Sequence, residues 1–476
     1  MTDPMPQDLT ATTASARGKG RPRVAETAAP SLVELLSLIR ADDPTTRQEL
    51  ERKSELGRAV VADRLTMLTD LGLIDESELG TATGGRAPRL VRLAARRGRV
   101  LVATLDQTAL GVGVADLAGN LLTEHHEEFE LTAPPLLLAE RLTTLLRWSL
   151  DRQTSPAGPW GISLSVPGTV LATAPSAVGD FLTTTPPAVP AWEGFPLVEM
   201  LTRSFGVPVW MRSSVDTMTM GELHAGAGQG VSSMLFVKVG RRIGAGIVSE
   251  GRLYRGALGA TGLIGAIPVS VGDRTGTLDA MAGSDMIFRE GRLAAETGRS
   301  AFLADSLRRG GEITAIDVAQ AAQMGDEVCA EILTMSGRLI GQVVATLTNT
   351  LNPEVIVLSG SIVQTNDIIL AAVREAVYGA SHPLVTRDLR IIRSHMGSSA
   401  GLVGAARVGA ELLFAPGFLK DWVMQGSPLL HPGFIAFRAG LDTVPPPVSS
   451  PPPRSIPPPS SVQPRISPPL IRRGAP

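Results

Sequence analysis

The sequence predicts an α/β protein that carries a small helical head at its N-terminus. Three patterns support this fold class. Apolar residues recur at helical spacing over residues 31–71, and two short strand-like runs around a glycine-rich turn follow them. Over residues 99–416, apolar strand-like runs alternate with helical stretches, which is typical of an α/β domain. From about residue 444 the chain is dominated by proline, and this favours an extended segment without a packed core.

Composition and charge narrow the functional classes. The 476-residue chain has a formal net charge of −2, so any contact with nucleic acid must be local rather than a property of the whole chain. A single cysteine, Cys329, excludes an internal disulfide framework and a cysteine-rich zinc site, and it fits a reducing cytoplasm. No apolar run reaches membrane-spanning length and the N-terminus lacks the apolar stretch of a secretory signal, so neither a membrane partner nor export is expected.

Residues 1–30 are polar and rich in threonine, alanine and proline, and we expect a disordered basic tail. Within it a Gly-Arg-Pro core is flanked by cations, and the residues concerned are Lys19, Arg21 and Arg23. The segment resembles an AT-hook, whose extended backbone lies in a narrow A·T-rich minor groove. Non-specific attraction to phosphates is the alternative interpretation.

Residues 31–93 are predicted to form a winged helix-turn-helix domain. The first helix, over residues 31–40, carries its leucines and isoleucine on one face. Thr46 is followed three residues later by Glu49, which predicts a capping box at the start of a second helix. A third helix is expected over residues 58–71. A glycine-rich turn between two short strands then predicts the wing.

The third helix and the wing supply the expected DNA contacts. In this fold the third helix enters the major groove with its N-terminal residues, while the cations of the wing reach phosphates or the minor groove. A solvated basic face is the alternative for the arginines that continue the run, Arg96, Arg97 and Arg99. The residues expected to contact double-stranded DNA are Arg58, Ala59, Val60, Arg86 and Arg89.

Glycine-containing motifs follow one another through the body of the chain. In this order and spacing they resemble the ROK family, whose name joins repressors, open reading frames and kinases. The resemblance covers residues 31–413 and implies a two-lobed, actin-like sugar-kinase fold over residues 99–416, behind the winged head. The motifs are TGGR at 83–86, GISLSVPG at 161–168, WEG at 192–194, the glycine run at 240–246, GRLYRG at 251–256 and VIVLSGS at 355–361.

The positions that carry catalysis in the family's kinases are changed in this chain. The catalytic aspartate of the family follows an asparagine, and here Ser213 and Ser214 occupy these two positions. A serine hydroxyl cannot act as the carboxylate base for a sugar hydroxyl at neutral pH. In the sugar-binding element G-E-x-G-H, Leu263 replaces the glutamate and Ala266 replaces the histidine. The resemblance therefore implies a body with no catalytic residues.

The same resemblance predicts which metals and small molecules the body can bind. The segment that corresponds to the family's zinc loop, about residues 269–277, has no cysteine, so we expect neither zinc nor another cofactor. Two arginines interrupt the glycine run and could hold an anion, or could simply be exposed loop residues. The residues expected around an effector are Ser213, Ser214, Leu263, Ala266, Arg241 and Arg242.

The sequence thus predicts a cytoplasmic, nucleoid-associated transcriptional regulator, in the form of a repressor, that binds DNA as a homodimer or tetramer. Its kinase-like body would serve for dimerisation and for binding a small-molecule effector, a sugar or a derivative. Two alternatives stay open, an ATP-dependent sugar kinase with an appended head and a constitutive DNA-binding or scaffold protein. Residues 417–476 are assigned to the tail, although residues 417–443 could instead form a last amphipathic segment.

Overall fold

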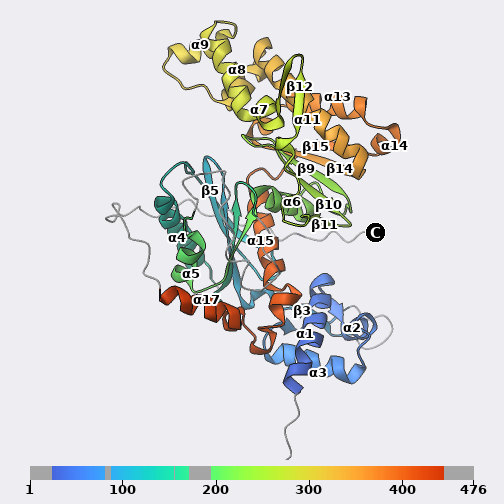
Figure 1. Ribbon diagram of the computed structural model, residues 1–476. Helices are drawn as coiled ribbons and strands as arrows, with labels where there is room; N and C mark the ends of the chain where they lie inside the picture. Colours follow the sequence, from blue (N-terminus) through green and yellow to red (C-terminus); the bar gives the residue numbers. More distant parts are fainter. Residues whose placement is uncertain (1–23, 81–86, 155, 171–193, 444–476) are drawn as a thin grey trace, which may run out of the picture.

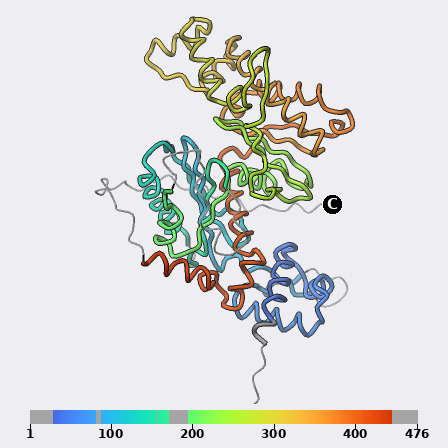
Figure 2. Tube along the Cα trace, viewed as in Figure 1, coloured from blue at the N-terminus to red at the C-terminus, as the bar shows by residue number. Residues whose placement is uncertain are grey.

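The computed structural model describes residues 24–80, 87–154, 156–170 and 194–443 (Figure 1). Three parts follow one another in space, the head, an N-terminal lobe and a C-terminal lobe, and the Cα trace shows how the last helices return to the head (Figure 2). This arrangement confirms the predicted fold class, a winged helix-turn-helix in front of a two-lobed α/β body.

The head contains the predicted three helices and a small sheet of order β1-β3-β2. The capping box is present, since the Thr46 hydroxyl accepts from the backbone N–H of Glu49 while the Glu49 carboxylate accepts from the backbone N–H of Thr46. The elements are α1 (Val24–Ala41), β1 (Thr45–Thr46), α2 (Arg47–Ser54), α3 (Arg58–Asp70), β2 (Ile74–Asp75) and β3 (Leu90–Leu93).

Helix α1 begins at Val24, whereas the sequence predicts a first helix over residues 31–40 and a tail over residues 1–30. Pro30 lies inside the helix, although proline removes one backbone hydrogen bond there. Ala28 is completely buried in the head core. The burial of Ala28 is one packing contribution that offsets the missing hydrogen bond.

The N-terminal lobe is built on a five-stranded sheet of order β6-β5-β4-β7-β8. Helices α4 and α5 cover one face and α15 covers the other (Figure 1). The strands are β4 (Arg99–Leu105), β5 (Ala109–Ala115), β6 (Leu121–Glu128), β7 (Pro159–Val166) and β8 (Val209–Ser213), and the helices are α4 (Pro135–Asp151), α5 (Leu197–Phe205) and α15 (Ser399–Leu413).

The C-terminal lobe has a second five-stranded sheet, of order β11-β10-β9-β14-β15, together with a helical subdomain. The strands are β9 (Met234–Lys238), β10 (Gly244–Ser249), β11 (Arg252–Tyr254), β14 (Val355–Ser359) and β15 (Arg390–Arg393), with a separate hairpin of β12 (Pro268–Val271) and β13 (Arg274–Thr277). The helices include α7 (Leu278–Ala282), α8 (Ser284–Glu296), α9 (Ala301–Arg308), α10 (Ala315–Gln323), α11 (Glu327–Leu351), α12 (Ser361–Thr365), α13 (Ile368–Ala380) and α14 (Pro383–Thr386).

Within the described residues, α11 alone is long and apolar enough to cross a membrane. Of its apolar window, 61% is buried inside the protein, and its closest partner is the neighbouring helix α13. Such burial is typical of a core helix in a water-soluble fold.

Two helices connect the lobes, α6 (Ser214–Ala225) on the way out and α15 on the way back. They pack against each other at very short range. A Cβ atom on Gly404 would lie 1.6 Å from the carbonyl oxygen of Thr217, and one on Gly221 would lie 2.1 Å from that of Ala400. Only glycine fits at these crossing points, so the two connections form one rigid pair.

Residues 417–443 are folded, which corrects the tail boundary drawn at residue 417. Helix α16 (Pro416–Leu419) and helix α17 (Pro432–Asp442) pack onto the N-terminal lobe. Trp422 is completely buried and meets Trp160 edge-on, with ring centroids 5.8 Å apart. This aromatic burial stabilises a segment that its glycines and prolines would otherwise leave without regular structure.

The head and the N-terminal lobe share one continuous hydrophobic core. Leu36 of the head, Leu101 of β4 and Val423 of the C-terminal segment belong to the same cluster of buried side chains. The second lobe has a core of its own. The head is therefore part of the N-terminal lobe in packing terms, and the C-terminal lobe has its own core.

Candidate DNA-binding head and effector cleft

The N-terminal turn of α3 is exposed. Its core side is fixed by Val61 and Leu65, which are buried. Arg58, Ala59 and Val60 lie on the surface, and the Arg58 side chain is 91% exposed. The structure thus places these predicted contacts together at one exposed helix end.

The start of α3 is also open to an anion. Its N-cap residue, Gly57, supplies no side-chain hydrogen bond, and the first turn contains no acidic residue. The first backbone N–H groups of a helix lack partners within the helix and carry partial positive charge. A DNA phosphate can therefore approach this end without meeting a carboxylate of the first turn. Outside that turn, the Glu51 carboxylate of α2 lies 3.9 Å from Nε of Arg58, and a phosphate bound by Arg58 would replace this contact.

The basic residues that follow α3 differ in their exposure to solvent. Arg89 is exposed beside β3. Arg99 was expected in an exposed basic run, but it is 4% exposed and its guanidinium donates to the carbonyl oxygens of Arg96 and Gly98, at 3.1 and 2.9 Å. It closes a turn of the chain and does not face solvent. The remaining predicted contacts, Lys19, Arg21, Arg23 and Arg86, lie outside the described residues.

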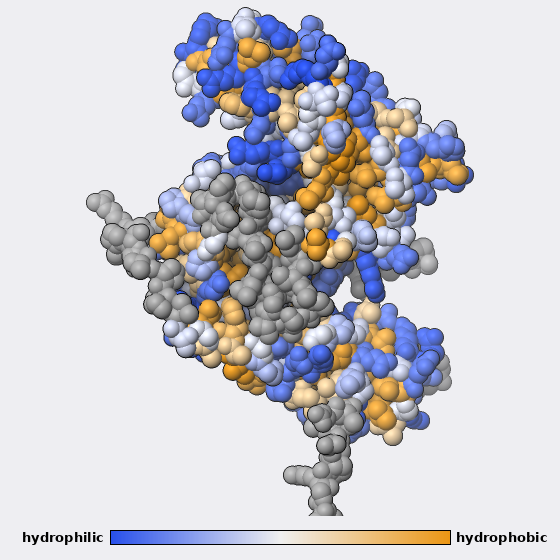
Figure 3. Space-filling model, viewed as in Figure 1, coloured by the Kyte–Doolittle hydropathy of each residue, from blue (hydrophilic) through white to orange (hydrophobic). Residues whose placement is uncertain are grey.

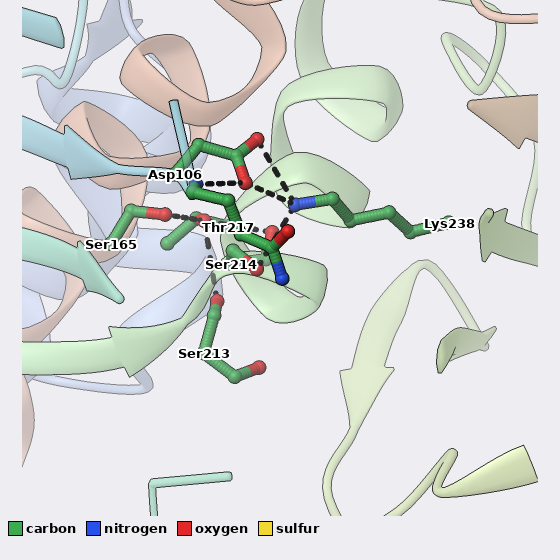
Figure 4. A network of polar contacts seen from close by, with 7 residues as sticks. Asp106, Ser165, Ser213, Ser214, Thr217 and Lys238 are labelled. Carbon is green, nitrogen blue, oxygen red and sulfur yellow. Dashed lines mark hydrogen bonds and ion pairs between the residues drawn. The ribbon is translucent and has the colours of Figure 1, made fainter. Parts of the chain in front are cut away.

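The two lobes meet at the N-terminus of α6, and the region around Asp106, Ser214 and Lys238 is called the cleft below (Figure 4). Ser213 caps this helix, because its hydroxyl accepts from the backbone N–H of Asp216 at 3.0 Å. Ser214, at the position of the catalytic aspartate, is buried. One turn further, the Thr217 hydroxyl lies 2.6 Å from that of Ser165, which ties α6 to β7. The side chains at this end of α6 therefore provide hydroxyl groups, and Ser214 provides no carboxylate at the position of the catalytic aspartate.

Lys238 joins the two lobes, although no sequence motif indicates a role for it. Its Nζ lies 3.3 and 3.5 Å from the two carboxylate oxygens of Asp106, in the turn between β4 and β5. It also lies 3.5 Å from the Ser214 hydroxyl (Figure 4). A protein cation therefore stands beside Ser214 and joins the two lobes. The one feature of the sequence that could have indicated this role is that Lys238 is the one lysine in residues 237–269.

The nearest carboxylate on α6 is also engaged. Asp216 pairs with Arg255 at 3.2 Å, and Arg255 donates as well to the carbonyl of Val170 at 3.4 Å. Burial raises the pKa of Asp216 above its usual value, and Arg255 offsets only part of that shift. This carboxylate is held by a cation, so it does not replace the missing base.

Glu222 links the two connections between the lobes. It is completely buried, and it accepts hydrogen bonds from the hydroxyl of Ser394 and, at 2.9 Å, from the backbone N–H of Ala227. Ser394 directly follows β15, in the segment that leads to α15. Glu222 therefore ties the outgoing helix to the returning chain at the pivot of the lobes.

The other predicted effector residues lie on the C-terminal lobe. Leu263 is 56% exposed, and Ala266 is exposed as well, on a short turn after β11. Arg241 pairs with Asp285 at 3.1 Å. Arg242 lies 3.9 Å from Asp279, so each of these two arginines has a carboxylate partner on its own lobe. The Ser214 hydroxyl instead contacts Lys238.

The segment at the zinc-loop position forms the β12–β13 hairpin, in which the hydroxyls of Ser270 and Thr275 lie 2.9 Å apart. Among the described residues, no group of three or more histidine, cysteine, aspartate or glutamate side chains could hold a metal ion.

Comparisons with known proteins agree on one family. The model of the ROK family matches residues 105–411. The xylose repressor of Bacillus spizizenii is 22% identical over 377 residues, which cover 79% of this chain and 94% of the repressor. The DNA-binding transcriptional dual regulator NagC of Escherichia coli is 25% identical over 383 residues, covering 79% of this chain and 91% of NagC.

Solved structures agree in fold. A ROK family transcriptional regulator, a homologue of the E. coli MLC protein, superposes with a TM-score of 0.67 at 22% identity and covers 84% of this chain and 100% of its own. A ROK family glucokinase from Streptomyces griseus, in complex with glucose and AMPPNP, has a TM-score of 0.52 at 20% identity and covers 65% of this chain and 99% of its own. The regulator thus matches a larger share of the chain than the kinase does.

Proposed function

The chain belongs to the ROK family and has the organisation of its transcriptional regulators, and from this premise we propose that it is a repressor whose kinase-like body senses a ligand without transferring phosphate. The observation that carries the proposal is the pairing of an exposed start of α3, whose first turn has no acidic residue, with a cleft in which Ser214 stands at the position of the base. The first feature suits DNA and the second opposes catalysis.

Several contacts argue against phosphoryl transfer. That reaction needs a base or positioning group at the nucleophile and room for the phosphates between the lobes. Ser214 cannot accept the proton as a carboxylate would, and Asp216 is held by Arg255. The ammonium group of Lys238 pairs with Asp106 and so bridges the two lobes. A sugar kinase with an appended head is therefore the weaker candidate.

The same contacts suggest how a ligand would act on DNA binding. The head shares its core with the N-terminal lobe. The C-terminal lobe is connected to that unit through the α6–α15 pair and the hydrogen bonds of Glu222. A ligand that favours a closed cleft would rotate the C-terminal lobe against the unit of head and N-terminal lobe. In a homodimer or tetramer joined through the bodies, this rotation would change the spacing of two heads on an inverted repeat.

The names of the relatives suggest the ligand class. They include a xylose repressor and an N-acetylglucosamine repressor, so a sugar or sugar derivative is the effector class to test first. The Leu263 and Ala266 side chains provide no hydrogen-bonding groups for sugar hydroxyls, which makes the preferred ligand less polar than a free hexose. The protein would act in the cytoplasm, on the nucleoid.

Two measurements on the full-length chain test this function. Selection of bound sequences from a random DNA library should yield an inverted repeat, and a panel of sugars should contain at least one that changes its affinity. Incubation with ATP and the same sugars should produce no sugar phosphate. Turnover would favour the kinase, while a specific DNA site that responds to no ligand would favour a constitutive DNA-binding protein.

A further inference from the structure

The exposed face of α3 carries an acidic residue where a DNA-reading helix would meet the bases. With about 3.6 residues per turn, Ala59, Asp63 and Thr66 lie opposite the buried Val61 and Leu65. All three are exposed, and the Asp63 side chain is 62% exposed. Figure 1 shows α3 at the outer edge of the head, away from the lobes. Asp63 therefore stands one turn into the row of residues that would face the groove.

Asp63 is held in place by an anchored neighbour. Its Oδ2 forms an ion pair with Nη1 of Arg64. Arg64 is itself only 12% exposed, and its Nε donates to the hydroxyl of Ser31 in α1 at 2.9 Å. The ion pair uses one carboxylate oxygen, so Oδ1 remains as an acceptor for another donor. The Ser31–Arg64 contact thus fixes the orientation of a carboxylate on the outer face of α3.

A carboxylate at this place has a narrow choice of partners in DNA. It is repelled by phosphates, and it gains only where a base presents an amino group. Cytosine presents its N4 amino group in the major groove, whereas adenine places the N7 acceptor beside its N6 amino group, and guanine and thymine present acceptors. On the basis of the function proposed above, we propose that Asp63 specifies cytosine at one position of each half-site and that Arg64 is its positioning residue.

Binding-site selection with the full-length protein tests this assignment. The wild-type protein should select cytosine at one position of each half-site. The Asp63→Asn variant should prefer adenine at that same position, because an asparagine amide pairs with N6 and N7 of adenine. The Asp63→Ala variant should lose about 10-fold of discrimination there and keep its preferences elsewhere. Arg64→Gln should weaken the cytosine preference at the same position, since it frees the carboxylate.

Asp388→Asn is the matched control, because Asp388 is an exposed aspartate on the C-terminal lobe, outside the head. It should select the wild-type sequence. An Asp63→Asn variant that folds normally, by its thermal unfolding midpoint, and yet selects the wild-type sequence would overturn the assignment. So would a uniform gain in affinity for all sequences, which would show only reduced repulsion. Failure of the wild-type protein to select any sequence would instead contradict DNA recognition itself.

Discussion

The guanidinium group of Arg40, in the last turn of α1, lies 4.6 Å from the centre of the Phe414 ring at the end of α15. Its Nη2 also donates to the carbonyl oxygen of Ala410 at 3.2 Å. Burial lowers the pKa of Arg40 to about 10, and the nearby Glu411 opposes this shift. A charged group of the head is therefore enclosed by the helix that returns from the cleft, and α15 joins the cleft directly to the DNA-binding head.

Replacement of Arg40 tests this joint. Arg40→Ala removes a charged hydrogen bond and a cation–π contact, and it should lower the free energy of unfolding by about 2 kcal/mol. Chemical unfolding followed by tryptophan fluorescence measures the loss. Arg338→Ala, at an exposed pair with Glu375, is the matched control and should change stability by less than about 0.5 kcal/mol. Equal stability of the two variants would contradict a tight joint.

The bridge between Lys238 and Asp106 should hold the lobes together without adding much stability. Lys238 is 15% exposed and Asp106 is 54% exposed, so solvent screens the pair and Lys238→Met should cost less than about 1 kcal/mol. Backbone amides of the turn between β4 and β5 should nevertheless exchange hydrogen faster in this variant, and the increase should also appear in wild-type protein at high salt. Lys420→Met, at an exposed lysine of the C-terminal segment, should leave exchange there unchanged.

The C-terminal segment should loosen in mild acid because of His431. This imidazole is buried and stacks on Phe418, with ring centroids 4.4 Å apart. Burial lowers the pKa of His431 below its usual value, and Asp421 offsets only part of the shift. The unfolded chain therefore takes up the proton more readily, and stability should fall as the pH drops below about 6.5 toward the lowered pKa of the folded state.

Thermal unfolding midpoints between pH 7.5 and 5 measure this effect. His431→Asn keeps a side-chain acceptor for the start of α17, where His431 now accepts from Phe434 at 3.3 Å, but it has no proton to gain. Its midpoint should vary less with pH than that of the wild-type protein. Some dependence will persist, because burial also lowers the pKa of His125. A pH profile identical to wild type would rule out His431 as a contributor.

Restoring one acidic group should not restore an enzyme. Ser214→Asp returns a carboxylate to the position of the base, but its nearest cation is Lys238, which lies 3.5 Å from the present hydroxyl and would pair with it. Leu263 and Ala266 would still offer no hydrogen bonds to a sugar. We expect no hexose phosphorylation above background in a coupled assay with ATP. Turnover in this variant would show that the base is the one part missing from a kinase.

Local signals in the sequence were sufficient to predict much of the secondary structure of the head. The Thr46–Glu49 capping box depends on residues three apart, and it is present as predicted. The α/β pattern of the body was equally readable because the strands are short apolar runs. By contrast, the bridge from Lys238 to Asp106 joins residues 132 positions apart, and no local pattern indicates such a pair.

The sequence was least informative where packing decides the structure. Trp422 and Phe418 hold residues 417–443 on the N-terminal lobe although the glycines and prolines around them break helical periodicity. Arg99 resembled its exposed neighbours in a basic run, yet its guanidinium is enclosed beside the start of β4. Burial of this kind depends on distant elements, so composition left residues 417–443 open between a folded segment and the tail and did not indicate the burial of Arg99.

Genome-wide occupancy of the full-length chain tests the central claim most directly, with Arg58→Ala beside wild type. Arg308→Ala is the control, since this exposed arginine lies on α9 at the mainly hydrophilic outer end of the C-terminal lobe (Figure 3). The account predicts discrete sites that share an inverted repeat, lost with Arg58→Ala and kept with Arg308→Ala. Occupancy that is absent, or that is diffuse and unchanged in Arg58→Ala, would contradict a regulator that recognises DNA through α3.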